Sequence, residues 1–305
     1  ALFLRVLSVV STMVASGASL VSCTWLLVKL SSGKAGFRNR LFPTQLRWLA
    51  FVDICFALST FALALADGGP VSSISLEVLD VICRWGQVSI NFFRHLSLWI
   101  EMHIAVSFAL RSFKMRWSTL MYRCLPCVCA PGLVFTLISA FMFRWSYDRS
   151  ARVCRPVSRT RAADPVSIAD FFLCLCVCSG CYVVVAWRSR RRQSPYSVQA
   201  RVCVRAEMYI LNVLVTYLPE FVLYLRPTLF TNDLLRLVAS VLEFSGGLLN
   251  TLTYALQSRY AAKLTGGPSA IRQQRDTNRG GPTYSVEFEE DGNALIEFVD
   301  PLENE

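Results

Sequence analysis

The sequence contains few charged side chains. Only 17% of its 305 residues are Asp, Glu, Lys or Arg, whereas 54% are hydrophobic. A soluble chain usually has about 25% charged residues, so this chain has too few charges to cover a soluble core of its apolar content. The apolar residues also gather in runs of about 20 residues or more, the length of a helix that crosses a bilayer. This composition predicts a membrane protein with several membrane-spanning segments.

Histidine and lysine are also scarce, and their positions argue against two further classes. Two histidines and no convergent cluster of nucleophiles or metal ligands favour neither an enzyme nor a bound cofactor. The lysines all lie outside the middle of the apolar runs, at Lys29, Lys34, Lys114 and Lys263. A retinal protein needs a lysine in its last membrane helix for the Schiff base, so this class is disfavoured as well.

Apolar segments divide the first 264 residues. They cover roughly 3–30, 43–66, 78–110, 119–142, 167–187, 203–225 and 234–257, judged against the length of a membrane helix. The first begins like a signal peptide, but its apolar run continues to Leu30, which is too long for the apolar region of a signal peptide. The pattern predicts an all-α fold in which seven transmembrane helices form a bundle.

The connections between these segments alternate in charge. One set is basic and contains no Asp or Glu; it comprises Lys29 to Arg40, Arg111 to Arg123, and Arg188 to Arg205. Basic connections stay on the cytoplasmic side, so we expect a multi-pass protein of the plasma membrane with its N-terminus outside and its C-terminus in the cytoplasm. The net charge of +10 mostly reflects this orientation, and no nucleic-acid partner is expected for the arginines of "RSRRRQ".

Residues 265–305 differ in composition from residues 1–264. Gly266, Gly267 and Pro268 open this region, and no Lys or Arg follows Arg279. An acidic segment with so little apolar surface cannot offset the entropy lost on ordering. We therefore expect a membrane domain followed by a disordered cytoplasmic tail. The candidates for regulatory phosphorylation in the tail are Thr277, Thr283 and Ser285.

Most of the twelve cysteines lie in or beside apolar segments and are interpreted as small packing residues. Clusters such as "CLCVCSGC" also suit a metal site, but residues two apart on a helix point in different directions. Cys124, near the cytoplasmic face, is a candidate for palmitoylation and hence for contact with membrane lipid. Cys83 and Cys154 lie on the outer, oxidising side, where disulfides persist. We expect these two to be bonded, with two free thiols as the alternative.

Ionisable residues inside membrane helices are costly and usually face the bundle or a cavity. Here they are Asp53, Arg94, His95, Glu101, His103, Asp170, Glu220 and Glu243. Our candidates for lining a ligand pocket that opens outward are Arg94, Trp99, Asp170, Glu220 and Glu243. The alternative is that these charges pair only with one another. The two histidines are interpreted as hydrogen-bonded packing residues rather than as metal ligands.

Several motifs resemble those of a G-protein-coupled receptor of the cyclic-AMP-receptor family (class E). In the third segment, "SLWIEMHIAVSFAL" is similar to that family's Ser-(Phe)-Leu-Trp…Ile-Ala pattern, and "LRWLAFVDICFAL" puts Asp53 at the polar position of segment two. Asn250 and Tyr254 match the Asn-(Pro)-x-x-Tyr motif, with Thr251 in place of the proline. The other matching positions are Cys83 and Cys154 (the outer disulfide), Pro219 (segment six) and Ser258 to Leu264 (a short juxtamembrane helix).

The resemblance covers about residues 1–264 and implies a receptor that transmits an extracellular ligand signal to a heterotrimeric G protein. It implies that Asp53, Asn250 and Tyr254 form an inner polar network that acts as a switch. The basic inner connections supply the candidates for G-protein contact, which are Arg111, Lys114, Arg190, Arg191 and Arg192. Segment three ends in "FALRSF" and has no Asp-Arg-Tyr.

The class of ligand is suggested only by charge. Residues 144–164 carry six arginines against two aspartates, so a small anionic ligand such as a nucleotide would be attracted to this outer loop. A transporter of a small solute, for example an anion, is the alternative function. It would favour an internal repeat and broken helices, and the sequence contains no evident repeat.

Overall fold

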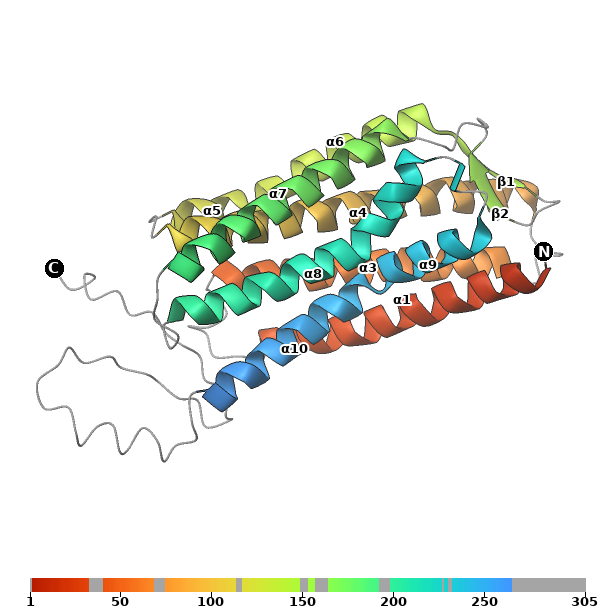
Figure 1. Ribbon diagram of the computed structural model, residues 1–305. Helices are drawn as coiled ribbons and strands as arrows, with labels where there is room; N and C mark the ends of the chain where they lie inside the picture. Colours follow the sequence, from red (N-terminus) through yellow and green to blue (C-terminus); the bar gives the residue numbers. More distant parts are fainter. Residues whose placement is uncertain are drawn as a thin grey trace, which may run out of the picture. The chain divides into compact units, whose positions relative to one another are not determined.

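The computed structural model describes residues 2–32, 41–68, 75–113, 117–148, 153–156, 164–191, 198–226, 228–229 and 232–264. Apart from one hairpin, this part of the chain is all-α (Figure 1). The chain divides into two compact units, residues 1–251 and residues 252–305, and the packing described below belongs to the first. The predicted tail, residues 265–305, lies outside the described residues.

The helices follow the predicted apolar segments along the chain. They are α1 (Leu2–Ser31), α3 (Leu41–Gly68), α4 (Leu76–Ser112), α5 (Ser118–Cys124), the 3-10 helix η2 (Pro126–Val128), α6 (Cys129–Met142), α7 (Pro165–Arg191), α8 (Val198–Leu225), α9 (Asp233–Phe244) and α10 (Gly246–Leu264). Between α6 and α7, the strands β1 (Trp145–Asp148) and β2 (Val153–Pro156) form an antiparallel hairpin. Residues 258–264 continue α10 and do not start a separate helix.

Three of the described helices are long and apolar enough to cross a membrane. The spans are Val6–Ser31 in α1, Leu41–Leu65 in α3 and Pro165–Arg188 in α7. Two further apolar stretches, Pro126–Met142 and Leu211–Leu225, are shorter. These helices indicate a membrane-embedded protein.

The two faces of α1 fit a lipid environment. Val14 and Val21 are exposed, whereas Ser16, Ser19 and Cys23 are buried against the rest of the first unit. The exposed and the buried residues each recur at intervals that keep them on one helix face. Apolar side chains thus point outward and small polar ones inward, because lipid offers no hydrogen-bond partners whereas neighbouring helices do.

Helix α4 lies at the centre of the first unit. It packs against α3, α6, α7 and β1, while α1 packs against α3 and α9, α7 against α8, and α8 against α9. These contacts close a circuit α1–α3–α4–α7–α8–α9, and α6 lies against α4 (Figure 1). Because α4 has neighbours on several sides, it buries the polar side chains of His95, Ser97, Glu101 and His103.

Two helices that the sequence analysis predicts as continuous are broken. Segment 119–142 consists of α5, η2 and α6, because Pro126 has no N–H for the helical ladder and the N–H of Val128 bonds to the carbonyl of Leu125 at 3.2 Å instead. Segment 234–257 divides at Ser245 into α9 and α10. Apolar length alone predicts a span but does not reveal an interruption within it.

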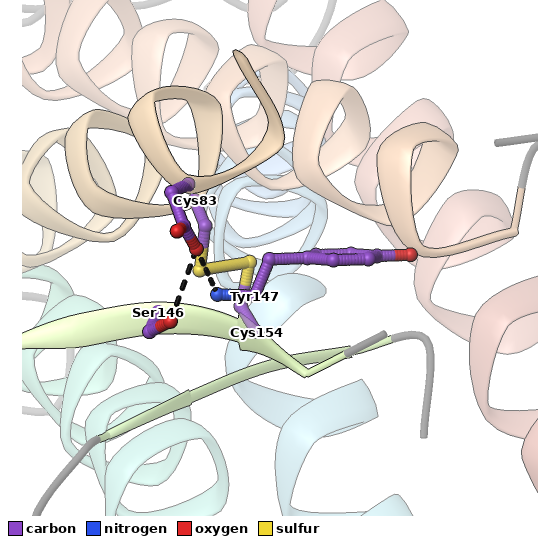
Figure 2. The surroundings of a disulfide bond; sticks show 5 residues. Cys83, Ser146, Tyr147 and Cys154 are labelled. Carbon is purple, nitrogen blue, oxygen red and sulfur yellow. Dashed lines mark hydrogen bonds between the residues drawn. A yellow bond between two sulfur atoms is a disulfide. The ribbon is translucent and has the colours of Figure 1, made fainter. Parts of the chain in front are cut away.

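The hairpin is attached to the start of α4. Cys83 in α4 and Cys154 in β2 form a disulfide, and Tyr147 pairs with Cys154 across the hairpin (Figure 2). The carboxylate of Asp80, one turn before Cys83, accepts hydrogen bonds from Ser146 Oγ at 3.0 Å and from the N–H of Tyr147 at 2.6 Å. The disulfide joins the two cysteines that the sequence analysis singles out, whereas the hairpin itself is not among its predictions.

Candidate functional site

A cluster of buried polar side chains connects α3, α4 and the start of α10. Asp53 in α3 accepts hydrogen bonds from Ser97 Oγ in α4 at 2.9 Å and from Asn250 Nδ2 in α10 at 3.2 Å. The same Asn250 nitrogen donates to Glu101 Oε1 in α4 at 3.3 Å. All four side chains are almost fully buried. One amide therefore links two carboxylates that belong to different helices.

Helix α8 completes this polar cluster. Asn212 Nδ2 donates to Asn250 Oδ1, and the hydroxyl of Tyr217 donates to Glu101 Oε1 at 3.5 Å. Asn250 thereby uses both its nitrogen and its oxygen. Ser97, Asn212 and Tyr217 are not among the network members predicted from the sequence. Burying an amide in an apolar segment costs free energy unless the amide finds a partner, and this signal would have found Asn212.

The structure shows only part of the network predicted for Asp53, Asn250 and Tyr254. The hydrogen bond between Asp53 and Asn250 is present. Tyr254 lies in the second unit, which begins at Leu252, so its membership of the network stays a prediction.

A buried ion pair lies next to the polar cluster. Arg94 Nε in α4 is 2.5 Å from Glu243 Oε1 in α9, and Arg94 Nη2 donates to Glu243 Oε2 at 3.3 Å. The Nη2 contact is a charge-assisted hydrogen bond, which is stronger than one between neutral groups, and the Nε contact is an ion pair by distance. This contact ties α9 to the central helix. Glu220 in α8 also faces α9, because it accepts a hydrogen bond from Ser240 Oγ at 3.3 Å.

A small cavity separates the polar cluster from the ion pair. Its lining includes Ser19, Asp53, Arg94, Ser97, Glu243 and Gly247, and its volume is about 10 Å³. That is about the room a single water molecule needs, far less than a pocket for a small organic molecule. In this conformation the site has the composition of a polar pocket but not the size of one.

The remaining ligand-pocket candidates point to other neighbours. His95 Nδ1 in α4 lies 2.5 Å from Asp170 Oδ2 in α7, and both side chains are fully buried. The ring of Trp99 lies 6.1 Å from that of Phe135 in α6. Asp170, Trp99 and Glu220 therefore do not line the cavity, whereas Arg94 and Glu243 do.

His103 connects α3, α4 and α5. Gln45 Nε2 in α3 lies 2.7 Å from His103 Nδ1, and His103 Nε2 lies 3.1 Å from the carbonyl oxygen of Met121. Since a backbone carbonyl only accepts, Nε2 carries the proton and Nδ1 accepts from the amide. Both ring nitrogens are thus satisfied in a neutral imidazole, which is the packing role predicted for this residue.

The side chains of the residues predicted to contact a G protein are not described by the structure. Lys114 and Arg192 lie outside the described residues, as do the candidate phosphorylation sites of the tail. Arg111, Arg190 and Arg191 lie on described helices, but their side chains are not described. The predicted G-protein contacts therefore stay predictions.

Apart from Cys83 and Cys154, the cysteines whose side chains the structure describes are free thiols. Cys174 and Cys178 approach each other with their sulfur atoms 3.9 Å apart, and the thiol of Cys174 faces the carbonyl of Leu98 at 3.8 Å. Among the described residues, no three His, Cys, Asp or Glu side chains are placed to hold a metal ion. The contacts of Cys174 are those of a packing residue between α4 and α7.

No model of a known protein family matches the chain, and no curated protein shows significant sequence similarity to it. The likeness to class E receptors therefore rests on the chain's own motifs and stays an expectation.

Proposed function

We propose that this protein is a G-protein-coupled receptor that transmits the binding of an extracellular small molecule to a heterotrimeric G protein. The observation that carries the proposal is the position of Asn250. Its side chain hydrogen-bonds to residues of α3, α4 and α8 at once. A buried amide with several competing partners can exchange hydrogen bonds with little loss of energy, and a network with two arrangements can act as a switch.

The proposed membrane topology has seven transmembrane segments. The membrane-length apolar helices α1, α3 and α7 support it, and so does the match between the remaining helices and the other apolar segments. In this topology the hairpin and its disulfide lie outside the cell, while the basic connections and the C-terminus lie in the cytoplasm. The proposed G-protein contacts are Arg111, Lys114, Arg190, Arg191 and Arg192.

The ion pair of Arg94 and Glu243 is the proposed target of the ligand. An anionic ligand that enters from the outer face would compete with the Glu243 carboxylate for the Arg94 guanidinium. Release of Glu243 frees α9, and α9 is followed directly by the helix that carries Asn250. Ligand binding would thereby favour a different arrangement of the polar cluster, as a population shift requires.

The test is a signalling assay in cells that express the chain with an extracellular N-terminal tag. A panel of anionic and neutral small molecules is applied, and cyclic AMP and calcium are recorded. We expect at least one ligand to give a response that is lost in Arg94→Gln at equal surface expression. If the panel is silent and the tag is accessible only after permeabilisation, both the function and the orientation are wrong.

Transport of a small anionic solute is a second candidate, favoured by the breaks at η2 and Ser245. Many transporters bind their substrates where membrane helices are broken, and here an arginine and a glutamate lie close to the second break. Uptake of labelled anions into proteoliposomes distinguishes the two functions, because a receptor moves no solute.

A further inference from the structure

The break between α9 and α10 is filled by a side chain from α1. The hydroxyl of Ser19 donates to the carbonyl oxygen of Phe244 at 2.6 Å, and its oxygen accepts from the N–H of Leu248 at 3.3 Å. In an uninterrupted α-helix, the N–H of residue 248 would bond directly to the carbonyl of residue 244. Ser19 therefore takes the place of one helical hydrogen bond and satisfies both of its groups.

The helical ladder is regular on either side of this point. The N–H of Ser245 bonds to the carbonyl of Val241 at 3.0 Å, and the N–H of Leu249 bonds to the carbonyl of Ser245 at 3.0 Å. The side-chain insertion is thus local to one turn. A group that inserts into the ladder of hydrogen bonds is one of the known causes of a sharp helix kink.

Gly247 allows α1 to approach closely enough for the insertion. A Cβ at this position would lie 2.5 Å from Cys23 Sγ and 3.4 Å from the Cβ of Ser19. Real Cβ atoms do not approach sulfur this closely, so a larger residue would require the Cys23 thiol or its helix to shift. A second glycine, Gly246, also faces a neighbour, because its Cβ would lie 3.2 Å from Thr216 Cγ2 in α8. Two adjacent glycines also make this turn the least helix-favouring part of the segment.

The break between α9 and α10, called the joint below, lies between an ion pair and a set of buried hydrogen bonds. On its α9 side, Glu243 is paired with Arg94, and on its α10 side, Asn250 is bonded to Asp53 and Glu101. A change of angle at the joint must therefore alter the position of one attachment relative to the other.

We infer that the hydrogen bonds of Ser19 stabilise the interrupted form of the α9–α10 joint, and that the joint has a second, straighter form. In the straighter form Ser19 withdraws and the N–H of Leu248 bonds to the carbonyl of Phe244. The carbonyl of Phe244 and the N–H of Leu248 keep a partner in both forms, because one direct hydrogen bond replaces the two that Ser19 makes. The inference concerns the joint alone and does not depend on the receptor function proposed above.

The test measures the position of α9 in the purified full chain in lipid nanodiscs. Spin labels are attached through noncanonical amino acids at the exposed positions Val238 in α9 and Leu58 in α3, which leaves all native cysteines unchanged. Distance distributions are recorded for the wild type, Ser19→Ala and Ser22→Ala. The last is a matched control, because the hydroxyl of Ser22 donates to carbonyls of its own helix, at 2.8 and 3.0 Å.

We expect a second or shifted distance population in Ser19→Ala, because without the hydroxyl the N–H of Leu248 and the carbonyl of Phe244 are left to bond to each other. Ser22→Ala should match the wild type. Superimposable distributions for all three proteins would overturn the inference. If Ser19→Ala does not fold, Ser19→Cys keeps the size of the side chain with weaker hydrogen bonding, and it should show the same shift to a smaller extent. A Ser19→Cys distribution equal to the wild type overturns the inference as well.

Discussion

The hairpin and the polar cluster both hold α4, but by different kinds of contact. At the hairpin, one covalent bond and an apolar cluster that includes Leu79, Tyr147 and Phe56 fix the start of the helix. In the polar cluster, hydrogen bonds hold the middle of the helix, and the nitrogen of Asn250 is shared between two carboxylates.

This difference shows where the molecule can change its conformation. A disulfide and close apolar packing have one favourable geometry, and leaving it costs contacts that nothing replaces. Hydrogen bonds inside a polar cluster can be exchanged for others of similar strength. We therefore expect the hairpin to act as a fixed attachment and the cluster to rearrange, and the following changes test this contrast.

The largest effect is expected from Glu243→Ala. It leaves the Arg94 guanidinium buried without its carboxylate, and the loss of one partner of a buried pair costs about 3–5 kcal/mol. Chemical unfolding in detergent measures the change in the free energy of unfolding. The double variant Arg94→Leu with Glu243→Leu should recover most of the loss, since it removes both buried charges. A single variant as stable as the wild type would show that the pair contributes nothing.

The next effect is expected from Cys83→Ser. The disulfide closes a loop with a sequence separation of 71 residues, and its removal should cost about 2–4 kcal/mol through the entropy of the unfolded chain. Thermal unfolding measures the loss, and the control is Cys127→Ser, which removes an exposed free thiol. If the contrast holds, the distance distribution of α9 stays unchanged in Cys83→Ser. Recovery of alkylated Cys83 and Cys154 from unreduced protein would contradict the disulfide itself.

We expect Asn250→Ala to lower the free energy of unfolding by less than the two changes above, but to change basal signalling by more. The loss of the amide removes one hydrogen bond from a buried partner in each of three helices, which costs about 1–3 kcal/mol. Since about 1.4 kcal/mol corresponds to a tenfold change in an equilibrium constant, basal G-protein activation should change several-fold at matched surface expression.

A double variant and a control distinguish a hydrogen-bonded network from residues that only pack. Asp53→Asn combined with Asn250→Ala should be non-additive, because the two residues share a hydrogen bond. The control is Thr24→Ala, whose hydroxyl is exposed and bonds only to the carbonyl of Leu20 in its own helix. Additive effects with basal activity equal to the wild type would mean that these residues only pack.

The smallest effect is expected from Asp80→Ala. Its carboxylate holds two groups of β1, and the loss of these partly buried hydrogen bonds should cost about 1 kcal/mol. With the disulfide intact, the hairpin stays in place and the change should be close to the limit of measurement. In the Cys83→Ser background the same substitution should cost more, and an equal cost in both backgrounds would show that the two attachments are independent.

The sequence predicts the helices well because apolar length is a local property. Each apolar segment needs about 20 residues to cross the membrane and must satisfy its own backbone, and no partner is needed to recognise it. The same reasoning assigns Asp53, Arg94, Glu101 and Asn250 to the interior, since lipid cannot solvate them. The pairing of Cys83 with Cys154 was expected because both were predicted to lie on the outer, oxidising side of the membrane.

Partners of the buried groups could not be predicted from the chain. Trp99 and Asp170 were expected to line the same pocket as Arg94, but α4 is covered on several sides, and its polar residues point to different neighbours. Helical periodicity gives the direction of a side chain around its own axis, whereas the identity of its partner depends on which helix lies there.

What the sequence by itself determined is a set of membrane helices whose polar residues turn inward. Only the tertiary structure decided that Asn250 lies between two carboxylates and that the last apolar segment is interrupted at Ser245. At this interruption the carbonyl of Phe244 accepts a hydrogen bond from Ser19, more than 200 residues earlier in the chain. A helical hydrogen bond is local, but its replacement by a hydroxyl from another helix is possible only where packing brings that hydroxyl to the backbone, and Gly247 provides the space.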